Sequence, residues 1–237
     1  MKKIFTFFAM AALSMGLVSC GASHELTIAN LKAAIDGETA ANAKYVAFSE
    51  RAEAEGLPEI AALFRATAQG EAIHISNHQA ALQGLGVADY TAVAPEFTVD
   101  STLMNLEAAV VAEQDESATM YPKFIEAAQQ EKADAALLSF NYAKDSEMDH
   151  SRLFKEAIAY ITTPRSQATV YYVCPKCGYI YAGAAAEACA LCGTTQDQYI
   201  VINAVLPVAT EETEVAEGTE APVAAVADAK TATEVKK

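Results

Sequence analysis

Two short segments of this sequence each place a glutamate three residues before a histidine. GEAIH holds Glu71 and His74, and SEMDH holds Glu147 and His150. In a helix, residues three apart lie on nearly one face, so each pair presents a carboxylate together with an imidazole. The chain has only four histidines, so the repeated pair indicates a metal site. A solvated face of an acidic helix would give the spacing of either pair taken singly.

Two further glutamates extend the pattern. Glu38 lies 33 residues before Glu71, and Glu113 lies 34 residues before Glu147, so the region has the form of two copies of one helical hairpin. Carboxylates can neutralise and bridge two cations about 3.5–4 Å apart, and each histidine adds a neutral nitrogen ligand. A Glu from each of two helices plus Glu-x-x-His from each of two others is the ligand pattern of di-iron carboxylate bundles.

Three other residues near this pattern are harder to assign. Glu116 lies three residues after Glu113, where it could compete with a histidine for one iron or simply be solvated. His24 has no predicted role. His78 lies one turn past His74 and is predicted to be solvated, as polar residues usually are.

Four of the five cysteines form two Cys-x-x-Cys pairs: Cys174, Cys177, Cys189 and Cys192. In an exported protein two disulfides are an alternative. Paired knuckles separated by a short loop are nevertheless a strong signature of a metal held by four thiolates.

Helical periodicity and turn residues predict the elements that position these groups. We expect helices over about 28–55, 59–83, 101–130 and 131–161, with Asp100 or Ser101 capping the third. Pro122 should kink or interrupt that third helix, because it lacks a backbone N–H. After residue 170 the sequence becomes rich in β-branched and aromatic residues beside Cys and Gly, which predicts a small strand-and-knuckle module that needs its metal to fold.

The start of the chain has the pattern of an export signal. Lys2 and Lys3 precede a short apolar run that ends in LVSC at Cys20, and this ending resembles a bacterial lipobox. Lipidation of Cys20 would make the protein an exported lipoprotein anchored to the membrane on the periplasmic or cell-surface side. The alternative is an ordinary signal peptide. The formal charge of −15 argues against nucleic acid as a partner.

These motifs together resemble the rubrerythrin family. The matching segments are GETAANAKY, GEAIH, AEQDESATMYPKF, SEMDH, CPKCGYIY and CALCG, within about residues 30–205. The resemblance implies a mainly α fold, a ferritin-like four-helix bundle followed by a small rubredoxin-like β/knuckle module. We therefore expect a signal peptide (1–19), a lipidated tether (20–29), a ferritin-like di-iron domain (30–163), a linker (164–170), a rubredoxin-like domain (171–205) and a disordered acidic tail (206–237).

The resemblance also implies roles for the site residues. Glu71 and Glu147 would bridge two non-haem irons. Glu38 would bind the first iron, together with His74 or Glu116 according to redox state. Glu113 and His150 would complete the second. Tyr45 and Tyr121 match tyrosines that hydrogen-bond to the site carboxylates, and with His74 and Glu116 they are the expected catalytic residues.

The implied activity is that of a peroxidase, which reduces hydrogen peroxide to water with electrons supplied through a rubredoxin-type iron in the four-cysteine site. Iron is favoured there over zinc because zinc is not redox active. Two features depart from this reading: Ala190 stands where the family commonly has proline, and the eleven residues between Cys177 and Cys189 also suit a zinc site. Ferritin-like iron oxidation or storage, and a non-enzymatic metal-binding lipoprotein, are the alternatives. The external electron donor is unknown. The resemblance implies a dimer in which one subunit's module faces the other's di-iron site, since within one chain the module would lie too far from the bundle site. We therefore expect a homodimer or larger assembly.

Overall fold

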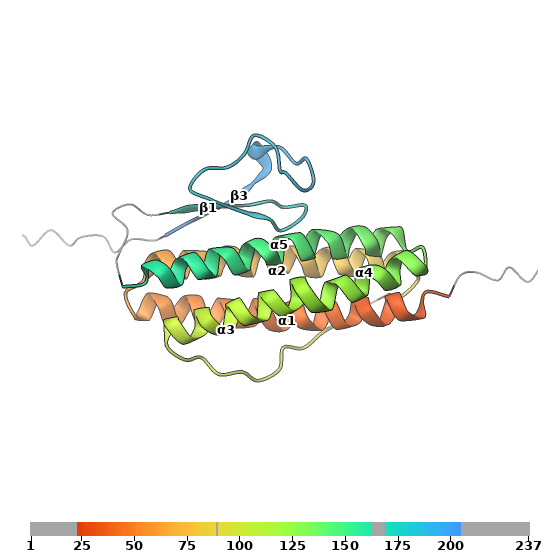
Figure 1. The fold of residues 1–237 in the computed structure, drawn as a ribbon, viewed down its shortest axis with the longest axis horizontal. Helices are drawn as coiled ribbons and strands as arrows, with labels where there is room; N and C mark the ends of the chain where they lie inside the picture. Colours follow the sequence, from red (N-terminus) through yellow and green to blue (C-terminus); the bar gives the residue numbers. More distant parts are fainter. Residues whose placement is uncertain (1–22, 89, 163–168, 205–237) are drawn as a thin grey trace, which may run out of the picture. The chain divides into compact units, whose positions relative to one another are not determined.

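The computed structural model describes residues 23–88, 90–162 and 169–204. The predicted signal segment, Cys20, most of the linker and the acidic tail lie outside these ranges. Five α-helices fill most of the described chain: α1 (Glu25–Ala54), α2 (Pro58–Gly84), α3 (Thr102–Asp115), α4 (Tyr121–Gln130) and α5 (Asp134–Tyr160). Figure 1 shows α1, α2, α5 and the continuous α3–α4 segment lying lengthwise beside one another as a four-helix bundle. Within the described residues, no helix is both long and apolar enough to cross a bilayer.

The first hairpin forms where the sequence predicts it. Gly56 adopts φ +74° in the turn, a conformation that glycine permits, and Pro58 begins α2, where its missing N–H is harmless. Helix α1 begins at Glu25, about one turn before the expected start. The carboxylate of Glu131 accepts hydrogen bonds from the backbone N–H groups of Leu26 and Thr27, at 3.2 and 2.8 Å. Such a distant cap is not visible in the local sequence.

The third helix is interrupted near Pro122, as predicted. A five-residue π-helical turn, η1 (Glu116–Met120), separates α3 from α4, and the N–H of Tyr121 bonds to the carbonyl of Glu116. Pro122 then lies in the first turn of α4. A π-turn adds one residue to a helix, so Tyr121 follows Glu113 by eight residues whereas Tyr45 follows Glu38 by seven.

A long connection joins the two hairpins along the length of the bundle. Near its start, the hydroxyl of Tyr90 donates to the carboxylate of Asp36, in the first half of α1, at 2.7 Å. At its end, the N–H of Thr102 donates to Glu55 at 3.1 Å, beyond the end of α1. Ser101 caps α3 by accepting from the N–H of Met104 at 3.4 Å. One such crossover is the topology of ferritin-like bundles.

The C-terminal module is a small antiparallel sheet with two cysteine knuckles. Its strands are β1 (Val170–Val173), β2 (Ile180–Ala182) and β3 (Ile200–Asn203), in the order β2-β1-β3. Tyr171, Val173 and Ile180 are buried in one apolar cluster with side chains of the bundle. Helix α2 makes most of the bundle's contacts with this sheet.

Candidate metal centres

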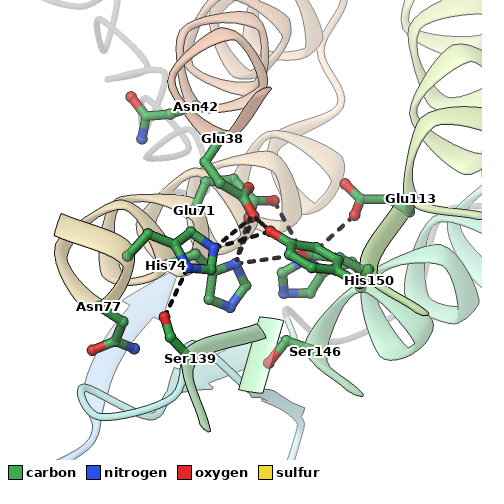
Figure 2. Close-up of polar contacts among 12 residues, drawn as sticks. Glu38, Asn42, Glu71, His74, Asn77, Glu113, Ser139, Ser146 and His150 are labelled. Carbon is green, nitrogen blue, oxygen red and sulfur yellow. Dashed lines mark hydrogen bonds and ion pairs between the residues drawn. The ribbon is translucent and has the colours of Figure 1, made fainter. Parts of the chain in front are cut away.

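Six acidic and imidazole side chains meet in the middle of the bundle. The first donor set consists of Glu38, Glu71, His74 and Glu147, and the second consists of Glu71, Glu113, Glu147 and His150. Within each set, one ligand atom per residue lies within 4.8 Å of the others, and every member is buried. Figure 2 shows Glu38, Glu71 and Glu113 converging on the space beside His74 and His150.

Each helix of the bundle supplies its part by simple periodicity. Glu38 comes from α1 and Glu113 from α3, while α2 and α5 each supply one Glu-x-x-His pair. Glu71 and Glu147 belong to both donor sets. Those are the positions that a carboxylate bridging two metal ions must occupy.

The donor atoms themselves fit a pair of cations. Many of their buried atoms make no well-formed hydrogen bond among the described residues: Glu38 Oε2, Glu71 Oε1, Glu113 Oε2, both carboxylate oxygens of Glu147 and both ring nitrogens of His150. The close neighbours of the two Glu147 oxygens are imidazole nitrogens of the same cluster, His74 Nδ1 at 2.9 Å and His150 Nδ1 at 2.6 Å. Burying carboxylates without compensation is strongly unfavourable. Four carboxylates with two imidazoles supply the oxygen and nitrogen ligands that suit divalent iron.

The pKa values of the clustered carboxyl and imidazole groups reflect their burial and their close charges. Burial, and then the charge of Glu147, raises the pKa values of Glu38 and Glu113 well above the usual range. Burial opposes charge on His74, but Glu147 and Glu71 outweigh it and raise the pKa of His74 to about 10. Burial likewise opposes charge on Glu147, yet His74 and His150 hold its pKa below the usual range. Without metal the cluster therefore retains protons, which metal ions must displace.

His74 is oriented from both sides. Its Nδ1 lies 3.0 Å from Glu71 Oε2 and 2.9 Å from Glu147 Oε1. Its Nε2 lies 3.1 Å from the backbone carbonyl oxygen of Cys177, which can only accept, so Nε2 carries the hydrogen. That bond leaves Nδ1 free to bind a metal, the usual arrangement for a histidine ligand held by an outer partner.

Glu116 lies outside both donor sets. It is half-buried at the start of η1, and its Oε1 would lie 3.8 Å from a Cβ placed on Gly37, the residue before Glu38. Burial and then the charge of Glu147 raise its pKa. The exchange of Glu116 with His74 as a ligand remains a prediction.

The two expected tyrosines each bond to a glutamate of the opposite hairpin. The hydroxyl of Tyr45 donates to Glu113, and that of Tyr121 donates to Glu38. Burial, followed by these same carboxylates, raises the pKa of both phenols well above the usual range. Both therefore stay protonated as donors.

The prediction that His78 is solvated is wrong. Its exposed fraction is 0 %, and its ring nitrogens face two hydroxyl groups: Tyr121 at 3.1 Å from Nε2 and Ser139 at 2.7 Å from Nδ1. Burial, then the charge of His74, lowers the pKa of His78 to about 3. The seven-residue spacing from Glu71 was the available signal, since it places His78 on the buried face of α2.

The four cysteines form a second candidate centre. All are free thiols, with sulfur–sulfur distances of 3.4 Å for Cys174–Cys192 and 3.5 Å for Cys177–Cys189, far beyond the roughly 2.05 Å of a disulfide. The two knuckles repeat one turn, in which the N–H of Gly178 bonds to Cys174 and that of Gly193 bonds to Cys189. Hydrogen bonding from Cys177 lowers the pKa of Cys174 to about 4. The group fits one tetrahedral metal ion.

The first knuckle touches the first donor set of the same chain. A Cβ added to Gly178 would overlap His74 Nε2, and one added to Gly70 would lie 3.1 Å from the Gly178 carbonyl oxygen. Ser146 also donates to the Cys177 carbonyl at 3.1 Å. The expectation that a chain's own module lies too far from its site is therefore wrong. The homodimer or larger assembly stays a prediction.

Comparisons with known proteins agree with these two centres. A family model described as Rubrerythrin matches residues 29–158. Nigerythrin from Nitratidesulfovibrio vulgaris is 38% identical over 73% of this chain and 85% of its own length. Rubrerythrin-2 from Clostridium acetobutylicum is 31% identical over 74% of this chain and 96% of its own.

A solved structure of nigerythrin in its fully reduced, all-ferrous state matches the fold as well. It has a TM-score of 0.68 and 38% identity, and the match covers 74% of this chain and 86% of that one. With the carboxylate–histidine bundle site and the four-cysteine knuckle both in place, the chain belongs to the rubrerythrin family.

Proposed function

We propose that this chain, a redox enzyme of the rubrerythrin family, reduces hydrogen peroxide to water at the paired donor sets, with electrons supplied through iron in the four-cysteine site. The observation that carries the proposal is the hydrogen bond from His74 to the carbonyl of Cys177. It joins a ligand of the first donor set directly to a residue whose thiol belongs to the four-cysteine site. A storage protein has no need of that connection.

The chain's residues would divide the work as follows. Iron held by the two donor sets would supply the two electrons that peroxide reduction needs, and two protons taken up from solvent would complete the two waters. Glu71 and Glu147 hold the pair together, and Tyr45 and Tyr121 stay protonated as hydrogen-bond donors to Glu113 and Glu38. The apolar aromatic cluster around Tyr45 excludes water from one side of the site.

Rapid mixing of the reduced, iron-loaded protein tests this proposal. The oxidation of both iron centres is followed by absorbance after mixing with peroxide or with oxygen. We expect the paired site to oxidise much faster with peroxide, and the four-cysteine iron to follow. Oxidation no faster with peroxide than with oxygen would contradict the peroxidase function.

We also propose that the protein is exported and anchored through a lipid on Cys20. The support is the sequence alone: a basic start, a short apolar run and a cysteine at its end. Only four residues lie between Cys20 and the first residue of α1. The bundle would then work close to the membrane surface.

A further inference from the structure

The two halves of the bundle surround their tyrosines with equivalent side chains, except at two positions. Phe64 and Phe140, each seven residues before an ExxH glutamate, pack against Tyr45 and Tyr121 at ring distances of 6.0 and 6.1 Å. Seven residues after those glutamates the halves differ. Phe154 packs on Tyr45 at 5.4 Å, but His78 packs on Tyr121 at 5.9 Å.

The second difference lies directly beside the first. Ser139, which contacts His78, precedes Phe140 in α5, and the equivalent residue before Phe64 in α2 is Leu63. One half is therefore apolar at both positions, while the other holds a buried histidine and a buried serine. Buried polar groups are unfavourable unless they are satisfied, so the bonds that these two make are the reason to examine them.

When Glu38 is ionised, the donor and the acceptor of each hydrogen bond around His78 are determined. A carboxylate can only accept, so the single hydroxyl hydrogen of Tyr121 points to Glu38. His78 Nε2 faces the same phenol oxygen and must donate to it. A neutral imidazole has one N–H, so Nδ1 accepts from Ser139. His78 Nε2 is 3.8 Å from Glu38, too far for a direct bond.

We propose that His78, held as the Nε2–H tautomer by its contacts with Ser139 and Tyr121, is a positioning residue that donates to the phenol oxygen of Tyr121 and so fixes and strengthens the bond that Tyr121 gives to Glu38. A phenol that accepts a hydrogen bond is also a stronger donor. Phe154 has no hydrogen to give Tyr45, so Glu38 receives a stronger bond than Glu113. The asymmetry falls on the half where His74 and Glu116 are predicted to exchange.

The tautomer can be measured without any turnover. In full-length protein loaded with zinc, which is redox-inert and diamagnetic, long-range ¹H–¹⁵N NMR correlations report which ring nitrogen of His78 is protonated. We expect hydrogen on Nε2 in the unmodified chain and a mixture of tautomers in Ser139→Ala. Ser151→Ala is the matched control, since Ser151 is a buried serine of the same helix whose hydroxyl has no hydrogen-bond partner among the described residues. Hydrogen on Nδ1 in the unmodified chain would overturn the proposal.

Kinetics then test whether the position matters, and this step rests on the proposed peroxidase function. His78→Phe gives this half of the bundle the same side chain as the other half, which has Phe154 at the equivalent position. The substitution should lower kcat for peroxide roughly tenfold with little change in KM. His78→Gln, whose amide can still donate to Tyr121, should recover most of that loss. Unchanged kcat in His78→Phe, or no recovery in His78→Gln, would refute a positioning role.

The tautomer measurement and the kinetics distinguish failure of the proposed function from failure of the inference about His78. If the unmodified protein does not turn over peroxide, the proposed function fails, whereas the tautomer measurement still decides the orientation of His78. If peroxide turnover is normal but His78 carries its hydrogen on Nδ1, only the present inference fails.

Discussion

Glu71 and Glu147 differ from the other ligands because each belongs to both donor sets. Glu38 and Glu113 each serve one set, and each is also held by a tyrosine from the opposite hairpin. A residue shared by two metal ions couples their binding, so losing it should affect both. A residue in one set should affect mainly that one.

Glu147→Ala, and equally Glu71→Ala, should therefore lose both irons of the paired site. The measurement is iron per chain, with the absorbance of the four-cysteine iron as an internal reference. Glu156→Ala provides a control on the same helix, since within the described part of the chain Glu156 lies in an exposed ion pair with Arg152, away from both donor sets. A full iron count in Glu147→Ala would rule out bridging.

His74→Ala should give a different result. The variant should retain much of its paired iron, because Glu38, Glu71 and Glu147 remain in the first donor set. It also loses the bond to the Cys177 carbonyl, so re-reduction of the paired site should be slowed on the order of tenfold or more. Iron content and single-turnover kinetics separate the two effects, and complete iron loss would contradict this assignment.

At the scale of elements, the contact between α2 and the first cysteine knuckle sets the distance between the two centres. A Cβ on Gly70 of α2 would lie 3.1 Å from both the Gly178 carbonyl oxygen and His150 Cε1, closer than ordinary van der Waals contact, so a neighbour would have to move by a few tenths of an ångström. Gly178 has φ +82°, a conformation that favours glycine. Both glycines therefore allow the backbone of the module to reach the bundle.

Gly70→Ala should push the knuckle away and destabilise the protein by about 1–3 kcal/mol, the usual range for overpacking. Electron transfer between the centres should slow, while the absorbance of the four-cysteine iron stays unchanged. Gly84→Ala is the matched control, because a Cβ at this last residue of α2 would meet no described atom within 4 Å. Equal transfer rates in the two variants would show that this close approach does not control coupling.

The sequence predicted what depends on helical periodicity and missed what depends on distant contacts. The spacing of Glu71 and His74 placed both on one face, and Pro122 correctly marked the interruption of the third helix. The seven-residue spacing from Glu71 could have indicated that His78 is buried, but its partners, Tyr121 and Ser139, come from other helices and no local pattern predicts them. The contact between His74 and Cys177 joins residues 103 positions apart, and no local pattern encodes it.

At the scale of the whole molecule, the metal-free protein should lose stability as pH rises. Glu38, Glu113, His74 and His150 all have raised pKa values when folded, against roughly 4.3 for Glu and 6.5 for His in an unfolded chain. The folded state thus binds more protons above those unfolded values, and the stability that is present at low pH is lost as pH rises toward the folded values. The lowered pKa values of Glu147 and His78 act the other way, Glu147 below about pH 4 and His78 below about pH 6.5.

Thermal unfolding of the metal-free full-length chain at pH 6 and pH 9 checks this sign. We expect a Tm lower by several degrees at pH 9. The iron-loaded protein is the comparison, because metal binding displaces the same protons and should remove the trend. A Tm that rises between pH 6 and pH 9 in the metal-free chain would contradict the assignment.

The proposed anchoring through Cys20 also concerns the whole chain. Cys20→Ser should move the protein from the membrane fraction to the soluble fraction, since the proposed lipid is its only predicted attachment. Fractionation followed by immunoblotting measures the change. Continued retention in the membrane fraction would count against lipidation.

The long connection between α2 and α3 has a consequence for folding. Each hairpin can form from neighbouring helices, but each donor set takes ligands from both hairpins, so neither set is complete until the hairpins have docked. Closing that loop lowers the conformational entropy of the chain, and the favourable metal contacts that offset this cost form only after the hairpins have docked. Iron should therefore act late, as a crosslink that locks two preformed halves together. A chelator should slow only this final locking step and leave helix formation intact.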